Sequence, residues 1–197
     1  MKAISIWGLA LGTVAAMGST SAAAENREGP ARGLEPELVR PVYHKDDPWQ
    51  DFRFLIGTWV SEGGPEKGSV TFSLEPDLHD KVLVRRNVAY PPAAKDRPPQ
   101  KHEDLMVIYW DAGAKQFRAS YFDSEGHVIQ YSVALLPARK GLVFVSEPDS
   151  SKLRFRLTYR KASGDLVDIN FAIAAPGQRD RFKTYLEGTV RRKPMGR

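Results

Sequence analysis

The sequence predicts an all-β protein, an up-and-down antiparallel β-barrel of about ten strands that follows a short helical turn. From residue 54 onward, short runs rich in Val, Ile, Phe, Tyr and Leu alternate with clusters of Gly, Pro, Asp and Ser. No stretch keeps a sustained helical period of apolar residues, so helix is limited to one turn near residues 49–54. Closing the strands into a barrel removes exposed edges, and a two-sheet sandwich is the alternative.

Each predicted strand starts where an apolar run follows a turn-forming cluster. The runs begin near Phe54, Ser69, Lys81, His102, Gln116, His127, Leu142, Leu153, Leu166 and Phe182. The clusters between them occupy residues 63–65, 75–77, 91–99, 111–113, 124–126, 137–141, 147–149, 162–164 and 175–177. A barrel of this many strands is wider than one of about eight, whose interior side chains can just fill it, so we expect an internal cavity.

Two of the turns predict a strand register. A loop at residues 162–164, with Gly164 in the left-handed conformation, pairs Lys161 with Asp165, Tyr159 with Val167, Leu157 with Ile169, Phe155 with Phe171 and Leu153 with Ile173. The opposite face is polar and carries Arg154, Arg156, Thr158 and Arg160 against Asp168 and Asn170. A loop at residues 124–126 pairs Asp123 with His127, Tyr121 with Ile129, Ala119 with Tyr131 and Phe117 with Val133. In both hairpins one face is apolar below the tip, and a slip of one residue would mix the faces.

The chain divides into four predicted parts. Residues 1–24 read as a cleaved secretory signal peptide, with Lys2, an apolar stretch too short to span a membrane, and small residues at 22–24. Residues 25–48 form an extended arm rich in proline and charge, residues 49–193 the barrel, and residues 194–197 a basic tail. We therefore expect a periplasmic or secreted protein that keeps no membrane-spanning segment after cleavage.

Composition excludes several classes of function. The chain has no cysteine, which excludes a disulfide scaffold, a cysteine zinc site, an iron–sulfur cluster and a thiol nucleophile. Its formal charge of +5 is below what a dedicated nucleic-acid-binding domain carries, so no nucleic-acid partner is expected. The oligomeric state stays open.

The first and last strands carry a recognisable pattern. Phe54-Leu55-Ile56-Gly57-Thr58-Trp59 opens the first strand, and Arg191-Arg192 ends the last. A Gly-x-Trp followed by an Arg near the end of the last strand resembles the calycin superfamily, which includes lipocalins and fatty-acid-binding proteins. The resemblance implies that Trp59 closes one end of the barrel and that Arg192 packs across its ring.

Over residues 50–193 the chain resembles a bacterial exported domain family that opens with Phe-x-x-Gly-x-Trp, and more distantly the haem-binding nitrobindin group. The resemblance lies in residues 83–87, 102–106 and 121–127. Nitrobindins bind haem through a histidine late in the chain, whereas no histidine follows His127 here. Haem is therefore an alternative cofactor for which no ligand can be assigned, and no other cofactor is expected.

Arg86 is the candidate for binding an anionic ligand group. It alternates with Val82, Val84 and Val88 on the more apolar face of its strand, which predicts that it points into the barrel. An arginine in a dry interior requires an anion, and fatty-acid-type barrels use interior Arg and Tyr for a carboxylate. The alternatives are pairing with an internal carboxylate, or an outward orientation. The predicted cavity lining is Tyr121, Tyr131, Phe155, Leu157 and Tyr159.

Asp123 and His127 face each other at a hairpin tip. A carboxylate that fixes one imidazole nitrogen prepares the other as a general base or metal ligand, although turns also select such residues for structural reasons. In His102-Glu103-Asp104, only His102 and Asp104 can share a face, and no metal-binding motif is present, so no metal site is predicted.

The favoured function is an exported, non-enzymatic barrel that binds a small apolar or amphipathic molecule. Three alternatives remain open: an acid–base enzyme that uses Asp123 and His127, a haem or nitric-oxide barrel, and an envelope interaction module that works through the arm.

Overall fold

The computed structural model describes residues 38–62, 68–90, 101–148, 151–178 and 181–194. The predicted signal peptide, the first part of the arm at residues 25–37, and the last residues of the basic tail lie outside this part of the chain. Within it, no helix is long and apolar enough to cross a membrane.

The described chain is a closed antiparallel barrel of ten strands, which confirms the predicted fold class. Each strand pairs with its neighbours in sequence, and β1 pairs with β10 to close the barrel. The strands are β1 (Gly57–Ser61), β2 (Ser69–Asp77), β3 (Val82–Tyr90), β4 (His102–Asp111), β5 (Gln116–Asp123), β6 (Val128–Leu135), β7 (Gly141–Ser146), β8 (Arg154–Lys161), β9 (Leu166–Ala174) and β10 (Lys183–Arg192). A single 3₁₀ turn, η2 (Pro137–Arg139), connects β6 to β7 among the described residues.

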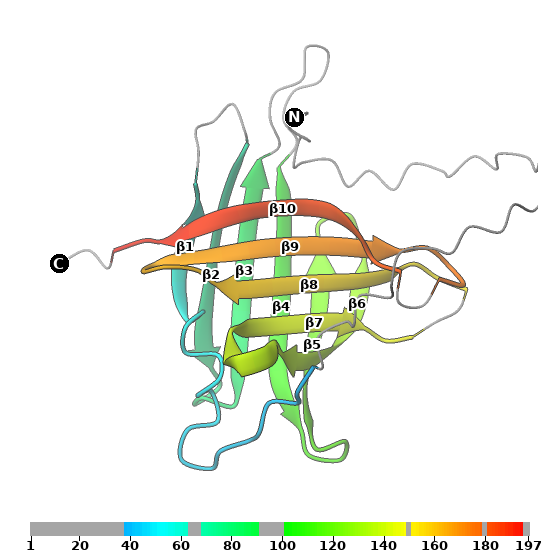
Figure 1. The fold of residues 1–197 in the computed structure, drawn as a ribbon. Coiled ribbons are helices and arrows are strands. Elements are labelled where there is room, and N and C mark those ends of the chain that lie inside the picture. Colours follow the sequence, from blue (N-terminus) through cyan, green and yellow to red (C-terminus); the bar gives the residue numbers. More distant parts are fainter. Residues whose placement is uncertain (1–37, 63–67, 91–100, 149–150, 179–180, 195–197) are drawn as a thin grey trace, which may run out of the picture.

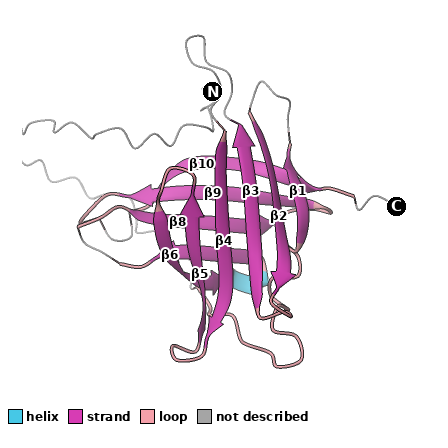
Figure 2. Ribbon diagram, turned by 180° about the vertical axis from the view of Figure 1, so that it is seen from behind, coloured by secondary structure: helices cyan, strands magenta, loops and turns pink. Residues whose placement is uncertain are grey.

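The barrel has two different ends. In Figure 1, β3 and β4 stand upright and β8, β9 and β10 cross in front of them, and Figure 2 shows the same crossing from behind. Because the strands run up and down in sequence, the odd-numbered strands all finish at one end, which we call the upper end, and the even-numbered strands finish at the lower end.

The lower end is closed by the chain that precedes β1. Residues 40–56 lie below the barrel in Figure 1, and the side chains of Trp49, Phe52 and Leu55 are buried. The ring of Phe52 packs 5.0 Å from that of Phe117, and Trp49 donates its indole N–H to the carbonyl of Asp80. Hydrogen bonds between residues three apart form a run of turns here, and the expected helical turn stays a prediction because no helix is assigned within residues 38–56.

Trp59 and Arg192 meet as the resemblance implied. The guanidinium of Arg192 lies 4.3 Å from the centre of the Trp59 ring and donates to the carbonyls of Phe54 and Ile56. Gly57 has φ +124°, and a Cβ there would lie 2.8 Å from Arg192 Nη1. Glycine is therefore required two residues before the tryptophan, because only glycine gives Arg192 room to reach those carbonyls.

The two predicted hairpin registers have different outcomes. The β5–β6 register is confirmed, with Tyr121 opposite Ile129 and Ala119 opposite Tyr131. The β8–β9 pairs are wrong by two residues, since Tyr159 lies opposite Ile169 rather than Val167. Gly164 is left-handed as expected, but the three-residue loop lies one position later, at residues 163–165, with Ala162 N–H bonded to the Leu166 carbonyl. A shift of two residues keeps every side chain on its predicted face, so the apolar face still points inward.

Candidate functional site

The predicted cavity-lining side chains point into the barrel. Tyr131 and Tyr159 are buried, and each packs edge-on against Phe144. Leu157 is buried beside them, while Tyr121 and Phe155 are half-buried. Burial raises the pKa of Tyr159 to about 12 and also raises the pKa of Tyr131 and Tyr121, so all three hydroxyls stay protonated at neutral pH.

Arg86 does not point into the barrel, and this prediction is wrong. Its side chain is exposed on the outer face of β3, whereas its neighbour Arg85 is only 7% exposed and lies inside. The error has a physical cause: β3 carries apolar residues on both faces, and Val84 packs on the outside opposite Val107 of β4. Apolar side chains therefore did not mark the inner face of this strand.

The buried Arg85 is paired with the carboxylate of Asp104 on β4. The Asp104 side chain is 4% exposed and also accepts a hydrogen bond of 2.8 Å from Asn87. Burial favours the neutral acid, but the charge of Arg85 and the hydrogen bonds from His102 and Asn87 hold the pKa of Asp104 below its ordinary value. Burial also opposes the charge on Arg85, and the attraction of Asp104 raises its pKa nonetheless. The pair is therefore ionised within the barrel.

His102 links this ion pair to the β5–β6 turn. Its Nε2 lies 3.3 Å from an Asp104 oxygen, which confirms the expected convergence, and its Nδ1 lies 2.9 Å from Glu125. The hydrogen bond to Asp104 raises the pKa of His102 to about 9, against the effect of partial burial and with further support from Glu125. His102 is therefore protonated at neutral pH and bridges two carboxylates.

Asp123 and His127 form the pair predicted at the hairpin tip. His127 Nδ1 lies 2.8 Å from Asp123 Oδ2, and the Asp123 side chain is 1% exposed. The other Asp123 oxygen accepts the backbone N–H groups of Glu125 and His127. This contact leaves Nε2 as the imidazole nitrogen directed away from Asp123, which is the arrangement an acid–base role would require.

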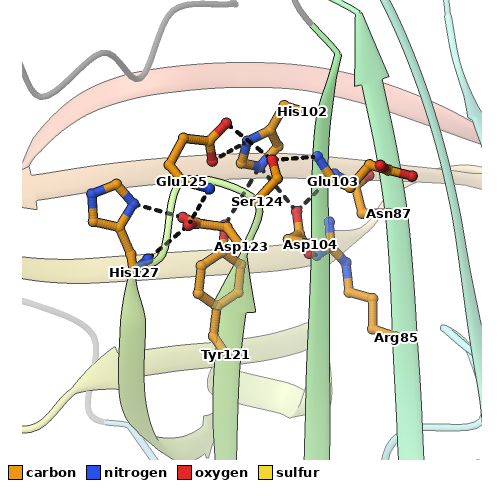
Figure 3. Close-up of polar contacts among 10 residues, drawn as sticks. All are labelled: Arg85, Asn87, His102, Glu103, Asp104, Tyr121, Asp123, Ser124, Glu125 and His127. Carbon is orange, nitrogen blue, oxygen red and sulfur yellow. Dashed lines mark hydrogen bonds and ion pairs between the residues drawn. The ribbon is translucent and has the colours of Figure 1, made fainter.

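These side chains form one network at the upper end, where β4 begins and β5 ends (Figure 3). The Tyr121 hydroxyl connects its two halves, at 3.4 Å from Asp123 and 3.5 Å from His102. Sequence reasoning missed Arg85, Asn87 and Glu125 as members. The signal for the first two was their spacing, since polar residues two apart on one strand share a face and have to find partners there.

A metal ion has little to bind in this network. One ligand atom from each of Asp123, Glu125 and His127 lies within 4.8 Å of the others. Both Asp123 oxygens already accept hydrogen bonds, however, and the two Glu125 oxygens are engaged by Ser124 and His102. Within the described residues this is the only group of three side chains with such spacing. Its two carboxylates already have hydrogen-bond partners within the protein.

The comparisons with known proteins give no family. No protein-family model matches the chain, and no curated protein is significantly similar to it. The closed ten-stranded barrel is consistent with a calycin-like fold, while the narrower resemblances to an exported bacterial family and to nitrobindins stay predictions.

The shifted pKa of His102 predicts a dependence of stability on pH. The pKa of His102 rises from 6.5 in the unfolded chain to about 9 in the folded protein. Its protonation therefore adds fully to the free energy of unfolding below pH 6.5, and this stabilisation is lost as the pH rises through about 9. We expect the free energy of unfolding to fall by about 1–2 kcal/mol between pH 7 and pH 10, allowing for partial exposure. Urea titrations at each pH measure it. The His102→Gln variant should lack this decline, and equal slopes for the two proteins would contradict the assignment.

Proposed function

We propose that the barrel binds a small amphipathic molecule that enters at the upper end. One observation carries this proposal: the inward-facing Tyr121, Ile129, Phe155 and Phe171 remain partly exposed there, whereas most inward-facing apolar side chains of the lower half are buried. Tyr121 and Ile129 lie next to the β5–β6 turn, and Phe155 and Phe171 stack with their ring centres 5.9 Å apart. Solvent reaches apolar surface at this end of the barrel, and covering that surface favours the binding of an apolar group.

The amphipathic character follows from the polar side chains at the same end. The network of His102, Asp104, Asp123, Glu125 and His127 lies there, and the half-buried Tyr121 contacts it through its hydroxyl. A molecule with an apolar body and one polar end satisfies both surfaces, whereas a purely apolar ligand would leave polar side chains facing it. The lower end is filled by Trp49, Phe52 and Phe117, which supports entry from above.

The neutral fluorescent dye N-phenyl-1-naphthylamine tests this proposal. We expect its emission to rise on titration with the protein, and the dissociation constant to increase about tenfold in Phe155→Ala, because the variant loses roughly 1–1.5 kcal/mol of aromatic contact. Phe122→Ala is the matched control, since Phe122 is 41% exposed on the outer face of β5. Circular dichroism would establish that both variants fold.

Two results would overturn the proposal. One is a wild-type protein that produces no rise in emission at any concentration. The other is a Phe122→Ala variant that weakens binding as much as Phe155→Ala does, since the dye would then be bound on the outer surface.

A further inference from the structure

A groove crosses the outer face of β7, β8, β9 and β10, on the outside of the barrel. These four strands lie side by side across the front of the barrel in Figure 1. The groove has a volume of about 660 Å³ and shares no residue with the polar network at the upper end. Leu38, Leu136 and Val143 line its β7 side, and charged, hydroxyl and amide side chains line the rest. A molecule bound there would contact both kinds of surface.

One row of side chains runs along the groove from strand to strand. Val143 of β7 lies opposite Thr158 of β8, and Thr158 lies opposite Asn170 of β9. Asn170 in turn lies opposite Glu187 of β10. Neighbouring strands are about 4.8 Å apart, so about 10 Å separates Thr158 from Glu187 across the sheet. The row therefore offers, in order, an apolar contact, a hydroxyl, an amide and a carboxylate.

Charges of opposite sign lie at the two ends of the polar part of this row. On β8, Arg156 and Arg160 lie two residues to either side of Thr158 and line the groove with it. On β10, the Glu187 side chain is exposed. Within the described residues, neither Arg160 nor Glu187 forms an ion pair. A ligand lying along the row would meet positive charge at β8 and negative charge at β10.

Asp168 of β9 does not cancel this polarity. It lies opposite Arg160, but the part of the chain that the structure describes contains no ion pair between them. Its carboxylate instead accepts a hydrogen bond of 2.8 Å from the Thr189 hydroxyl of β10. Asp168 therefore adds to the negative charge on the side of the groove near β10.

The hydrogen-bonding groups of the row match those of a short peptide. A terminal carboxylate can accept from the Thr158 hydroxyl and the Arg160 guanidinium, and a terminal ammonium can donate to Glu187. Asn170 donates through its amide nitrogen to the Thr184 hydroxyl at 3.0 Å, which leaves Asn170 Oδ1 to accept a peptide N–H.

The length of the row selects a dipeptide. Two extended residues separate the terminal charges by about 7 Å, which leaves room for hydrogen bonds within the span of about 10 Å. A single amino acid carries both charges on one carbon atom and cannot reach both ends. Three extended residues span about 10 Å and leave no such room.

We infer that this outer groove binds dipeptides whose C-terminal side chain is apolar. The carboxylate lies over Thr158 between the two arginines, and the ammonium lies at Glu187. The C-terminal side chain points toward Val143 and Leu38, where it covers a leucine that is 41% exposed. This site is separate from the proposed binding site inside the barrel.

Calorimetric titration of the full chain at pH 7 tests this inference with four compounds. Alanyl-leucine carries every group that the groove matches. Its C-terminal amide and its N-acetyl derivative each lose one charge, and we expect each to bind about tenfold more weakly. Alanyl-glycine loses the apolar side chain and should bind about fivefold more weakly than alanyl-leucine.

Two variants assign the charges to residues. Arg160→Gln should weaken alanyl-leucine about tenfold and narrow its advantage over the C-terminal amide. Glu187→Gln should remove the advantage of alanyl-leucine over the N-acetyl derivative. Arg86→Gln and Glu75→Gln are the matched controls, since both side chains are exposed on other strands, and they should leave all four affinities unchanged. Circular dichroism checks that every variant folds.

Several results would overturn the inference. Equal binding of all four compounds would show that the terminal charges are not recognised. Absence of binding by any of them would mean that the groove is covered by something else, such as a second copy of the chain. Tighter binding of hexylphosphocholine than of alanyl-leucine would assign the groove to a zwitterionic lipid head group. None of these results affects dye binding inside the barrel, so the two proposals fail independently.

Discussion

Replacing Asp104 with alanine is expected to lower the free energy of unfolding by about 3–5 kcal/mol, one of the two largest effects of a single substitution that we predict. The substitution leaves the guanidinium of Arg85 buried without its counter-charge. It also removes the acceptor for Asn87 and one of the two acceptors for His102. Urea denaturation followed by tryptophan fluorescence measures the change.

Two further variants distinguish the loss of the Arg85–Asp104 ion pair from a general effect of substituting a residue in β4. Glu103→Ala alters the next residue, whose ion pair with Lys101 is exposed, and should cost less than about 1 kcal/mol. The double replacement of Arg85 by Met and Asp104 by Leu should recover most of the lost stability, because it removes both charges together. An Asp104→Ala variant as stable as Glu103→Ala would contradict the ionised pair.

Trp59→Ala should be similarly destabilising, by about 3–5 kcal/mol, because it empties a large volume of the core. Trp59 is 1% exposed, stacks on Phe72 and donates its indole N–H to the Leu55 carbonyl at 2.8 Å. Its loss also removes the ring on which Arg192 packs. Thermal and urea unfolding measure the effect.

Phe122→Ala provides the comparison for this variant too, since it removes an outer-face aromatic side chain and should cost less than about 1 kcal/mol. If Trp59→Ala were no worse than Phe122→Ala, the lower part of the barrel would not depend on the tryptophan, and the structural meaning given to the Gly-x-Trp pattern would be wrong.

The fold was predictable because its signals are local. A strand and the turn that ends it lie within a few residues of each other, and the tip of the β5–β6 hairpin places Asp123 beside His127 without reference to the rest of the chain. The orientation of Tyr131 and Tyr159 follows from alternation along single strands, and even a register error of two residues in β8–β9 did not change it.

The network at the upper end was only partly predictable because it depends on neighbouring strands. Arg85 is paired with Asp104 of β4, which lies opposite Asn87, and the sequence does not give that register across the long connection at residues 91–100. The orientation of Arg86 was wrong for a related reason. Three valines, Val82, Val84 and Val88, lie on the outer face of β3, so alternation pointed to the wrong face, and only the barrel's closure decides which face is the inner one.

The arrangement of polar and apolar groups assigns different roles to the two ends. At the lower end, Trp49, Phe52 and Leu55 fill the space and bring the arm's last residues against the barrel. At the upper end, His102 and Asp123 form part of a polar network that the hydroxyl of the half-buried Tyr121 contacts. The lower end is therefore closed by side chains, and ligand binding is expected in the upper half.

Native mass spectrometry of the full chain, purified without detergent from the cells that normally produce it, tests the binding function most directly. We predict a population heavier than the protein by the mass of one small molecule, which denaturation releases and which N-phenyl-1-naphthylamine displaces. Protein that carries no added mass, and that also fails to bind N-phenyl-1-naphthylamine after purification, would contradict the proposal that the barrel interior is a binding site.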